Sequence, residues 1–372
     1  MIPFIDLQAQ RRRLGADLTK AISDAVEGGQ WIMGPQVTAL EAQLAEFAGV
    51  KHAIACANGT DALLIVLRAW NIGPGDAVFV PAFTFAASAE VVALVGASPV
   101  FVDVLEDTFN MDPQSLEAAI AMVKREGKLK PRAVMPVDLF GQTADYRVLE
   151  LIIRRENLKM LCDAAQGFGG LLDGRRSGGI GDAAATSFFP AKPLGCFGDG
   201  GASFTNDDGL ADLVRSIRIH GQGTDKYENV RIGVNSRLDT IQAAILIEKL
   251  KIFPEEIEMR DTVARRYSSA LSRSNCIGVP RVIEGAQSTW AQYTIQVPDR
   301  AKLQADLKAK EIPTAVYYPI PLSRQKGYRE FPSAPIPVSE KLSKTVVSLP
   351  MHPYLDAATQ DRIIEAVLES VQ

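Results

Sequence analysis

Short apolar runs recur through the first 250 residues, and each leads through a polar or glycine-containing turn into a helical pattern. Continuous apolar strands that alternate with amphipathic helices are typical of a mainly parallel sheet covered on both faces. The pattern therefore predicts a large α/β domain. Its segments are HAIACANGTDALLIVLRAW (52–70), VFVPAFTFAASAEVVALV (78–95), SPVFVDV (98–104), DPQSLEAAIAMV (112–123), AVMPVDLFG (133–141), YRVLELIIRREN (146–157), KMLCDAAQ (159–166) and AAATSFFP (183–190).

The pattern changes after residue 250, where a long charged stretch predicts a helix. A strand at 291–298, a helix at 301–311, a strand at 313–319 and terminal helices are expected to follow it. This order predicts a second, smaller α/β domain. We place the boundary near Phe253 and Pro254, which gives a large domain of residues 1–252, including an N-terminal arm, and a small domain of residues 253–372.

Composition narrows the class of protein. Of the 372 residues, 47% are hydrophobic and 23% are charged, as in ordinary globular proteins. The formal net charge of −4 gives no reason to expect nucleic acid or an anionic membrane as a partner. The first residues lack the apolar run of a signal peptide, and no stretch of about 18 apolar residues predicts a membrane span. We therefore expect a cytoplasmic protein.

Cysteine and histidine are too sparse to suggest a metal or disulfide framework. The four cysteines form no C-x-x-C pair, and the three histidines lie far apart in the sequence. Such spacing favours reduced, mostly buried thiols over disulfides or a zinc site. The chain also lacks a G-x-G-x-x-G turn after a strand and a Walker lysine loop, so dinucleotide and P-loop sites have no anchor.

Ligands of parallel sheets bind at the carboxyl ends of the strands, so polar residues at those ends are the candidates for a site. Lys192 follows a strand-like run and lies among apolar residues in SFFPAKPLGCFGDGG. Most lysines are solvated surface charges. A partly desolvated lysine would instead have a lowered pKa, which frees the neutral amine for Schiff-base chemistry.

Asp163 ends the strand in KMLCDAAQ and is the second candidate. It is either the N-cap of a helix that starts at Ala164, or an acid buried against a cationic ring nitrogen. A protonated pyridine nitrogen, as in pyridoxal phosphate (PLP), needs such a partner to act as an electron sink. Gln166 lies three residues later and could hydrogen-bond the substituents of the same ring.

Asn58, Gly59 and Thr60 lie between a predicted strand and a predicted helix. A helix N-terminus offers free N–H groups and a positive dipole end, and glycine permits close approach of the backbone to phosphate. The alternative is an ordinary capped helix. Ser187, five residues before Lys192, is a second candidate for a phosphate-binding hydroxyl, or simply a serine at a strand end.

Three further residues are weaker candidates. Phe85, in PAFTF, could stack on a cofactor ring, although a phenylalanine at a strand–helix junction is more often part of the core. Asn235 and Arg237 precede a predicted helix in RIGVNSRLDTIQAAIL. The arginine could bind a carboxylate or phosphate, or it could be a surface or domain-bridging charge.

Taken together, these segments resemble the DegT/DnrJ/EryC1/StrS family of sugar aminotransferases, which has the type I PLP-dependent fold. The resemblance extends from end to end, in segments that follow the order expected for the family. They are FIDLQAQ, WIMGPQVTALEAQLAEFAGV, ANGTDAL, IGPGDAVFVPAFTFAASAE, DAAQGFG, SFFPAKPLGCFGDGGA, GVNSRLDTIQAAIL and SLPMHPYL. The family implies a large domain with a mainly parallel seven-stranded sheet and a smaller C-terminal α/β domain.

The resemblance also implies roles for the candidate residues. Lys192 matches the lysine that binds PLP covalently, Asp163 the partner of the pyridine nitrogen, and Gln166 the residue beside the ring hydroxyl. The phosphate-binding positions of the family fall on a group of three small residues. These are Gly59, Thr60 and Ser187.

Other positions of the family bear on the ring, the substrate and the partner subunit. Phe85 matches the aromatic residue that stacks on the cofactor. Asn235 matches a phosphate ligand that the family takes from the neighbouring subunit, and Arg237 a substrate-side residue reaching across the same interface, so a homodimer with shared sites is implied. Tyr317 and Tyr318 border the sugar pocket, although many relatives have histidine where this chain has Tyr317.

Within the family, the sequence around Lys192 and Arg237 is most similar to that of UDP-2-acetamido-2-deoxy-hex-3-uluronate aminotransferases of bacterial polysaccharide synthesis. The resemblance therefore implies amination of a nucleotide-linked 3-keto sugar, with glutamate as amino donor. Enzymes that aminate C4, such as perosamine synthases, are the nearest alternative. Some relatives have histidine in place of the lysine and act as sugar dehydratases, but this chain keeps the lysine. A non-catalytic sugar-nucleotide binder is a further alternative.

Overall fold

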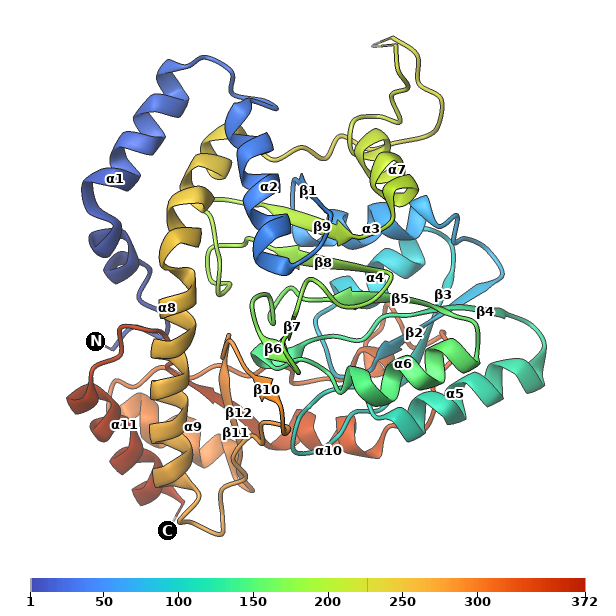
Figure 1. Ribbon diagram of the computed structural model, residues 1–372. Helices are drawn as coiled ribbons and strands as arrows, with labels where there is room; N and C mark the ends of the chain where they lie inside the picture. The colour runs from blue at the N-terminus through green and yellow to red at the C-terminus, as the bar shows by residue number, and fades with distance from the viewer. Residues whose placement is uncertain (1, 226, 372) are drawn as a thin grey trace.

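The computed structural model describes residues 2–225 and 227–371 (Figure 1). The helices are α1 (Leu7–Glu27), α2 (Pro35–Ala48), α3 (Gly59–Ala69), α4 (Ala87–Leu94), α5 (Pro113–Glu126), α6 (Tyr146–Arg155), α7 (Asp208–Arg218), α8 (Thr240–Leu271), α9 (Arg300–Ala309), α10 (Pro337–Thr345) and α11 (Ala357–Ser370), with short 3₁₀ turns η1 (Leu139–Gly141) and η2 (Leu322–Arg324). The strands are β1 (His52–Cys56), β2 (Asp76–Pro81), β3 (Ser98–Val102), β4 (Lys130–Val134), β5 (Lys159–Asp163), β6 (Leu171–Leu172), β7 (Arg175–Arg176), β8 (Ala183–Ser187), β9 (Gly201–Thr205), β10 (Ala286–Gln287), β11 (Tyr293–Gln296) and β12 (Val346–Leu349).

Seven strands form the central sheet, in the order β1-β9-β8-β5-β4-β2-β3. Only β9 is antiparallel to its two neighbours, which confirms the predicted mainly parallel seven-stranded sheet. The strands are apolar on both sides because helices cover both faces. Helices α2, α5, α6 and α8 pack on one face, and α3, α4 and α7 on the other (Figure 1).

A second hydrophobic core lies below the sheet in the view of Figure 1, around the two-stranded pair β11 and β12. The C-terminal half of α8, together with α9 and α11, supplies most of its side chains. Ile2 also belongs to this core, so the start of the chain packs against its end. The expected division between residues 252 and 253 falls within α8, and a large and a small domain would therefore share this helix.

Two sequence expectations in this half of the molecule need correction. The helix predicted after residue 250 begins earlier, at Thr240, and continues through Pro254 although proline has no N–H to donate. The strand predicted at 313–319 is not formed. Only Ala315 pairs with β12, through Ser348, because a proline at each end of this segment cannot extend a strand ladder.

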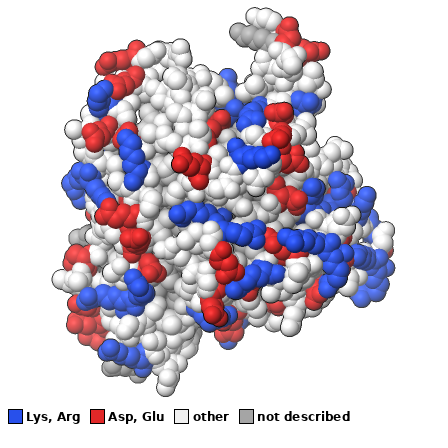
Figure 2. All heavy atoms as spheres, in the orientation of Figure 1, with Lys and Arg blue, Asp and Glu red and all other residues white. Residues whose placement is uncertain are grey.

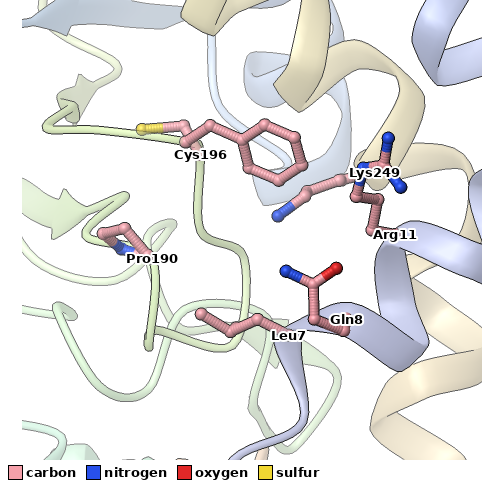
Figure 3. A pocket seen from close by; sticks show the side chains of 7 residues that line it. Leu7, Gln8, Arg11, Pro190, Cys196 and Lys249 are labelled. Carbon is pink, nitrogen blue, oxygen red and sulfur yellow. The ribbon is translucent and has the colours of Figure 1, made fainter.

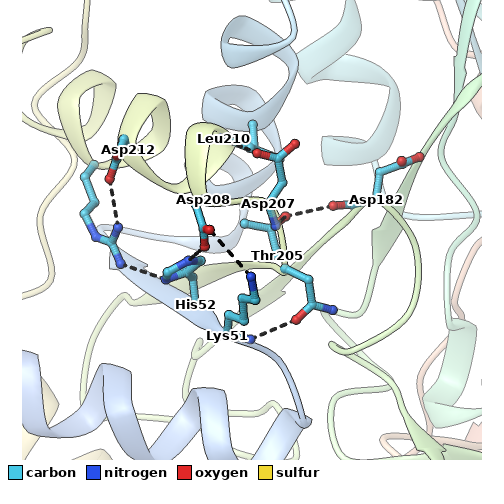
Figure 4. A network of polar contacts seen from close by, with 10 residues as sticks. Lys51, His52, Asp182, Thr205, Asp207, Asp208, Leu210 and Asp212 are labelled. Atoms are coloured by element: carbon cyan, nitrogen blue, oxygen red, sulfur yellow. Dashed lines mark hydrogen bonds and ion pairs between the residues drawn. The ribbon is translucent and has the colours of Figure 1, made fainter.

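The end of the sheet opposite the carboxyl ends of its parallel strands is tied to α7 by polar contacts (Figure 4). Asp207 caps α7, and its carboxylate accepts the N–H of Leu210 at 3.0 Å. His52, at the start of β1, lies between Asp208 at 2.7 Å and Arg215 at 3.3 Å. These contacts fix the helix to the sheet at a distance from the strand ends that carry the candidate site.

Charged side chains of both signs lie on the face of the molecule shown in Figure 2. Acidic and basic side chains are interspersed over most of this face. Within residues 2–225 and 227–371, no helix combines the length and apolarity needed to cross a membrane. The same residues contain no group of three or more His, Cys, Asp or Glu side chains arranged to hold a metal ion.

Candidate active site

A cavity of about 440 Å³ lies at the carboxyl ends of the parallel strands. Most of its lining comes from the large sheet and its loops, and Gln292, Tyr317 and Tyr318 close it from the C-terminal region. Its position is the one that the sequence predicts for a ligand of such a sheet. The candidates that line it are Gly59, Thr60, Phe85, Asp163, Gln166, Ser187, Lys192, Tyr317 and Tyr318.

Asp163 projects into this cavity from the last position of β5 and is almost fully buried. Its Oδ2 accepts a hydrogen bond of 2.8 Å from the Ser88 hydroxyl, and its Oδ1 accepts the N–H of Ala165 at 3.1 Å. Burial raises the pKa of Asp163, whereas Ser88 and the Ala165 N–H lower it. No helix starts at Ala164, since residues 165–169 form turns, so the N-cap interpretation of Asp163 is wrong.

Lys192 lines the same cavity and is half-buried, so the interpretation as a solvated surface charge is wrong. Its loop leaves β8 and closes on itself, with the Lys192 N–H bonded to the Phe189 carbonyl at 2.8 Å. Burial lowers the pKa of Lys192, and the attraction of Asp163 opposes that shift. An amine with a lowered pKa is more often neutral at physiological pH, so a larger fraction is free to act as a nucleophile or to accept a proton.

The N-terminus of α3 faces the cavity beside Ser187. Asn58 caps this helix by accepting the Asp61 N–H at 2.8 Å, so the capping interpretation is right. That cap leaves the N–H groups of Gly59 and Thr60 without helical partners. A Cβ atom on Gly59 would lie 2.6 Å from the Ser187 Cβ, so only glycine allows the helix to approach the strand end this closely. Capping and phosphate binding are therefore compatible here.

Gln166 is held in one orientation by two hydrogen bonds. Its Oε1 accepts the Phe140 N–H at 2.9 Å, and its Nε2 donates to the Tyr318 hydroxyl at 3.1 Å. Phe85 lies at the cavity rim with its ring centre 6.3 Å from that of Tyr318. It is exposed and does not belong to the hydrophobic core, contrary to the ordinary expectation for its position.

Asn235 and Arg237 do not line the cavity of their own chain. Asn235 is exposed and Arg237 is half-buried. Their neighbour Ser236 accepts the N–H of Ala57 at 3.1 Å, which places the pair close to the start of α3 but outside the cavity. The structure thus brings together all the candidates except these two.

Sequence reasoning missed three polar residues in this region. Ser88, the donor to Asp163, is a single hydroxyl in the alanine-rich start of α4, and only that contrast could have marked it. Asp199 and Gln292 line the cavity, and the buried Gln292 Oε1 has no hydrogen-bond partner among the described residues. Gln292 comes from the C-terminal half of the chain, so its position in the sequence does not predict that it lies near the other site residues.

A lysine amine and a buried carboxylate in one cavity of a mainly parallel sheet are typical of an α/β enzyme. The profile of the DegT/DnrJ/EryC1/StrS aminotransferase family matches residues 12–368, and the chain belongs to this family, as its sequence motifs predict.

Three known proteins illustrate the similarity. The UDP-2-acetamido-2-deoxy-3-oxo-D-glucuronate aminotransferase of Pseudomonas aeruginosa is 49% identical over 359 residues, which are 96% of this chain and 97% of that protein. The crystal structure of a DegT DnrJ EryC1 StrS aminotransferase from Brucella abortus is 54% identical, covers 100% of both chains and has a TM-score of 0.98. NtdA from Bacillus subtilis with bound cofactor PMP is 30% identical, covers 100% of this chain and 85% of its own, and has a TM-score of 0.89.

Proposed function

We propose that this protein is a PLP-dependent aminotransferase that converts a UDP-linked 3-keto sugar, a 2-acetamido-hex-3-uluronate, to its 3-amino sugar with glutamate as donor. The observation that carries the proposal is that Lys192 and Asp163 face the same cavity and interact electrostatically there. The 49% identity to the Pseudomonas enzyme over nearly the whole chain supports the choice of substrate. The product would serve bacterial surface polysaccharide synthesis, and the enzyme would act in the cytoplasm.

The residues of the cavity fit PLP. Its phosphate would lie at the α3 N-terminus, against the backbone of Gly59 and the hydroxyls of Thr60 and Ser187. Phe85 would stack on the ring from the rim. Gln166 would lie beside the ring hydroxyl, with its amide already fixed by Phe140 and Tyr318.

When bound, PLP supplies a protonated ring that accepts electron density from the carbon undergoing amine exchange. Asp163 would keep the proton on the ring nitrogen by accepting its hydrogen bond. Ser88 and the Ala165 N–H hold the Asp163 carboxylate in place and favour its charged form. The burial that raises the pKa of Asp163 also prevents water from competing for this contact.

Lys192 has two tasks in the proposed reaction. Its amine would hold the cofactor between turnovers and would be released when glutamate takes its place; it would stay free while the keto sugar receives the amino group. The free amine would take a proton from the α-carbon of the donor in the first half-reaction and would deliver one to C3 of the sugar in the second. Because burial lowers the pKa of Lys192, the amine can accept that proton near neutral pH.

The substrate side of the cavity is bordered by Tyr317 and Tyr318. Apart from Lys192, the lining residues include no cation that could receive the uronate carboxylate. Arg237, which makes no hydrogen bond or ion pair among the described residues of its own chain, is the proposed receptor. It would reach the sugar from the neighbouring subunit.

A homodimer follows from this assignment. Phe85 and Phe189 line the cavity yet are 55% and 52% exposed, which leaves two aromatic rings at its mouth for a second copy to cover. The described part of the segment between α7 and α8 (residues 219–225 and 227–239), which contains Asn235, extends away from the body of the molecule (Figure 1). In the proposed dimer, the partner subunit's Asn235 completes the phosphate site.

The absorption spectrum of the purified protein tests the chemistry. We expect a yellow protein whose visible band is lost when glutamate is added and is restored by the keto sugar. The Lys192→Ala variant should have no turnover. Loss of the band with glutamate but product formation only from a 4-keto-6-deoxy sugar would replace the proposed substrate, whereas a protein that cannot take up PLP would overturn the enzyme assignment.

Shared sites are tested by mixing two inactive variants, Lys192→Ala and Asn235→Ala. A mixed dimer would contain one site with both changes and one site with neither. Random mixing should therefore restore about one quarter of the wild-type activity if each site uses both subunits. No recovery, with mixed dimers demonstrated by mass spectrometry, would show that Asn235 acts within its own chain.

A further inference from the structure

Lys249 is a buried lysine that the proposed reaction does not use. It lies in α8 and is only 2% exposed, and its side chain points from that helix toward the loop that carries Pro190 and Cys196 (Figure 3). Its ammonium donates a hydrogen bond of 2.5 Å to the Gly195 carbonyl and lies 4.6 Å from the centre of the Phe197 ring. Burial lowers the pKa of Lys249 to about 8.

Burying this charge is unfavourable, because no carboxylate among the described residues forms an ion pair with Lys249. A hollow of about 320 Å³ lies beside it, lined on one side by Leu7, Gln8 and Arg11 of α1 (Figure 3). The hollow contains no acidic side chain either. The Gly195 carbonyl is thus the hydrogen-bond acceptor that compensates for the burial of this lysine.

Gln242 holds the same loop at a second point. Its Oε1 accepts the Phe197 N–H at 2.8 Å. Gln242 and Lys249 are seven residues apart, which places them on one face of α8 two turns apart. One helix therefore forms hydrogen bonds with both the carbonyl of residue 195 and the N–H of residue 197.

Residues 195–197, which α8 holds in this way, belong to the same loop as Lys192. Cys196 bonds through its N–H to the Phe188 carbonyl at 2.8 Å. A Cβ atom on Gly195 would lie 2.5 Å from the Pro190 carbonyl oxygen, so the two backbones are already in contact. Lys192 lies inside the loop that these contacts close, and a shift at Gly195 must therefore move its backbone.

We propose that Lys249, with Gln242 as its second contact point, is a positioning residue for Lys192. It acts through the Gly195 carbonyl and touches neither cofactor nor substrate. The inference rests on the proposed function in one respect only, namely that Lys192 is the reactive amine. Its role is to keep that amine at the angle and depth at which it meets the reacting carbon, and small displacements of such groups cost as much as about 10²-fold in rate.

The test uses the holoenzyme with Lys249→Met, which keeps the volume of the side chain but donates no hydrogen bond. We expect kcat to fall by about tenfold or more with KM changed less than about twofold, because orientation is lost and binding is not. The pH midpoint of the visible band should shift, since that midpoint reports the surroundings of Lys192. Lys249→Arg keeps a donor and should recover part of kcat.

Lys251→Met is the matched control, because Lys251 lies on the same helix, is exposed, and its ammonium pairs with no carboxylate other than Glu248 among the described residues. It should behave as the wild type. Gln242→Leu provides an independent second variant if Lys249→Met does not fold, and it should shift the same midpoint. If both variants fold, bind cofactor fully and keep the wild-type kcat and midpoint, the positioning role is overturned and the contacts are structural only.

A measurement without cofactor separates this inference from the proposed function. In the cofactor-free protein, the rate at which an amine-directed reagent labels Lys192 can be followed by mass spectrometry. We expect Lys249→Met to lower this rate severalfold at fixed pH, because a loosened, more hydrated Lys192 has a higher pKa. An unchanged labelling rate would count against positioning even if the protein proved to use another cofactor.

Discussion

Gln166 donates a hydrogen bond of 3.1 Å to the hydroxyl of Tyr318, which joins the turn after β5 to the C-terminal segment. The other end of the amide is occupied by the Phe140 N–H, so Gln166 cannot reverse its orientation without losing both bonds. The Tyr318 hydroxyl therefore accepts one hydrogen bond and keeps its own proton for a group in the cavity. Burial raises the pKa of Tyr318, so that proton is retained across the working pH range.

Replacing Tyr318 by Phe removes this donor while keeping the ring. We expect kcat/KM to fall by about tenfold, since a hydrogen bond of about 1 kcal/mol is lost and the Gln166 amide is left unpaired. Steady-state kinetics measure the effect. Tyr328→Phe, on a ring outside the cavity, should leave kcat/KM unchanged, and an equal loss in both variants would contradict the assignment.

Replacing Ser88 by Ala should move the acidic limb of the kcat profile to higher pH. The Ser88 hydroxyl lowers the pKa of Asp163 by bonding its charged form, so its removal raises that pKa. Asp163 then becomes protonated at a higher pH, and activity is lost earlier as the pH falls. Ser268→Ala removes a hydroxyl that is bonded to Tyr293 in the second core, and its profile should match the wild type. An unshifted limb in Ser88→Ala would mean that Asp163 does not set it.

Replacing Gly59 by Ala tests the contact between α3 and β8. The new Cβ would lie 2.6 Å from the Ser187 Cβ, so one of the two segments proposed to bind phosphate must move. We expect about 1–3 kcal/mol of overpacking strain and PLP binding weakened by about tenfold or more. Gly73→Ala is the control, because its nearest atom would be the Val95 carbonyl oxygen at 3.6 Å. Titration with PLP, followed by absorbance, distinguishes the two.

Acid stability should depend on His352, which is buried and has no hydrogen-bond partner for either ring nitrogen among the described residues. Burial first, and Arg260 second, lower its pKa to about 4. The unfolded chain therefore binds this proton more readily than the folded one, and the free energy of unfolding falls as the pH drops from about 6.5 toward 4. Between pH 7 and pH 4.5, the free energy of unfolding of the wild type should fall by about 2 kcal/mol more than that of His352→Leu. Urea unfolding at both pH values measures the difference, and parallel losses would contradict it.

The large sheet was predictable because its strands are apolar on both faces and each ends in a turn. The C-terminal half was harder. The expected domain boundary fell near Pro254, yet α8 continues through this residue because the helix is packed on both sides, for example by Gln10, whose Nε2 donates to Glu256 at 2.9 Å. Tertiary contacts here override a local signal that a sequence pattern registers as a boundary.

The site could be predicted wherever chemistry and strand position coincide. Lys192 and Asp163 each follow a buried strand, so the parallel topology alone places them at one edge of the sheet. Ser88 could not be identified in this way, because its importance depends on a hydrogen bond to a residue 75 positions away. The same holds for Lys249. Its partner is the backbone carbonyl of Gly195, and every residue has such a carbonyl, so the sequence does not predict this contact.

The continuity of α8 has a consequence for how members of this family can be recombined. A chimera that joins the first part of one relative to the last part of another at residue 253 would splice two half-helices of different sequence. It would also separate Gln242 and Lys249 from the second core to which their helix is anchored. Exchange points should instead lie before Asp239 or after Leu271, so that the whole helix is inherited from one parent.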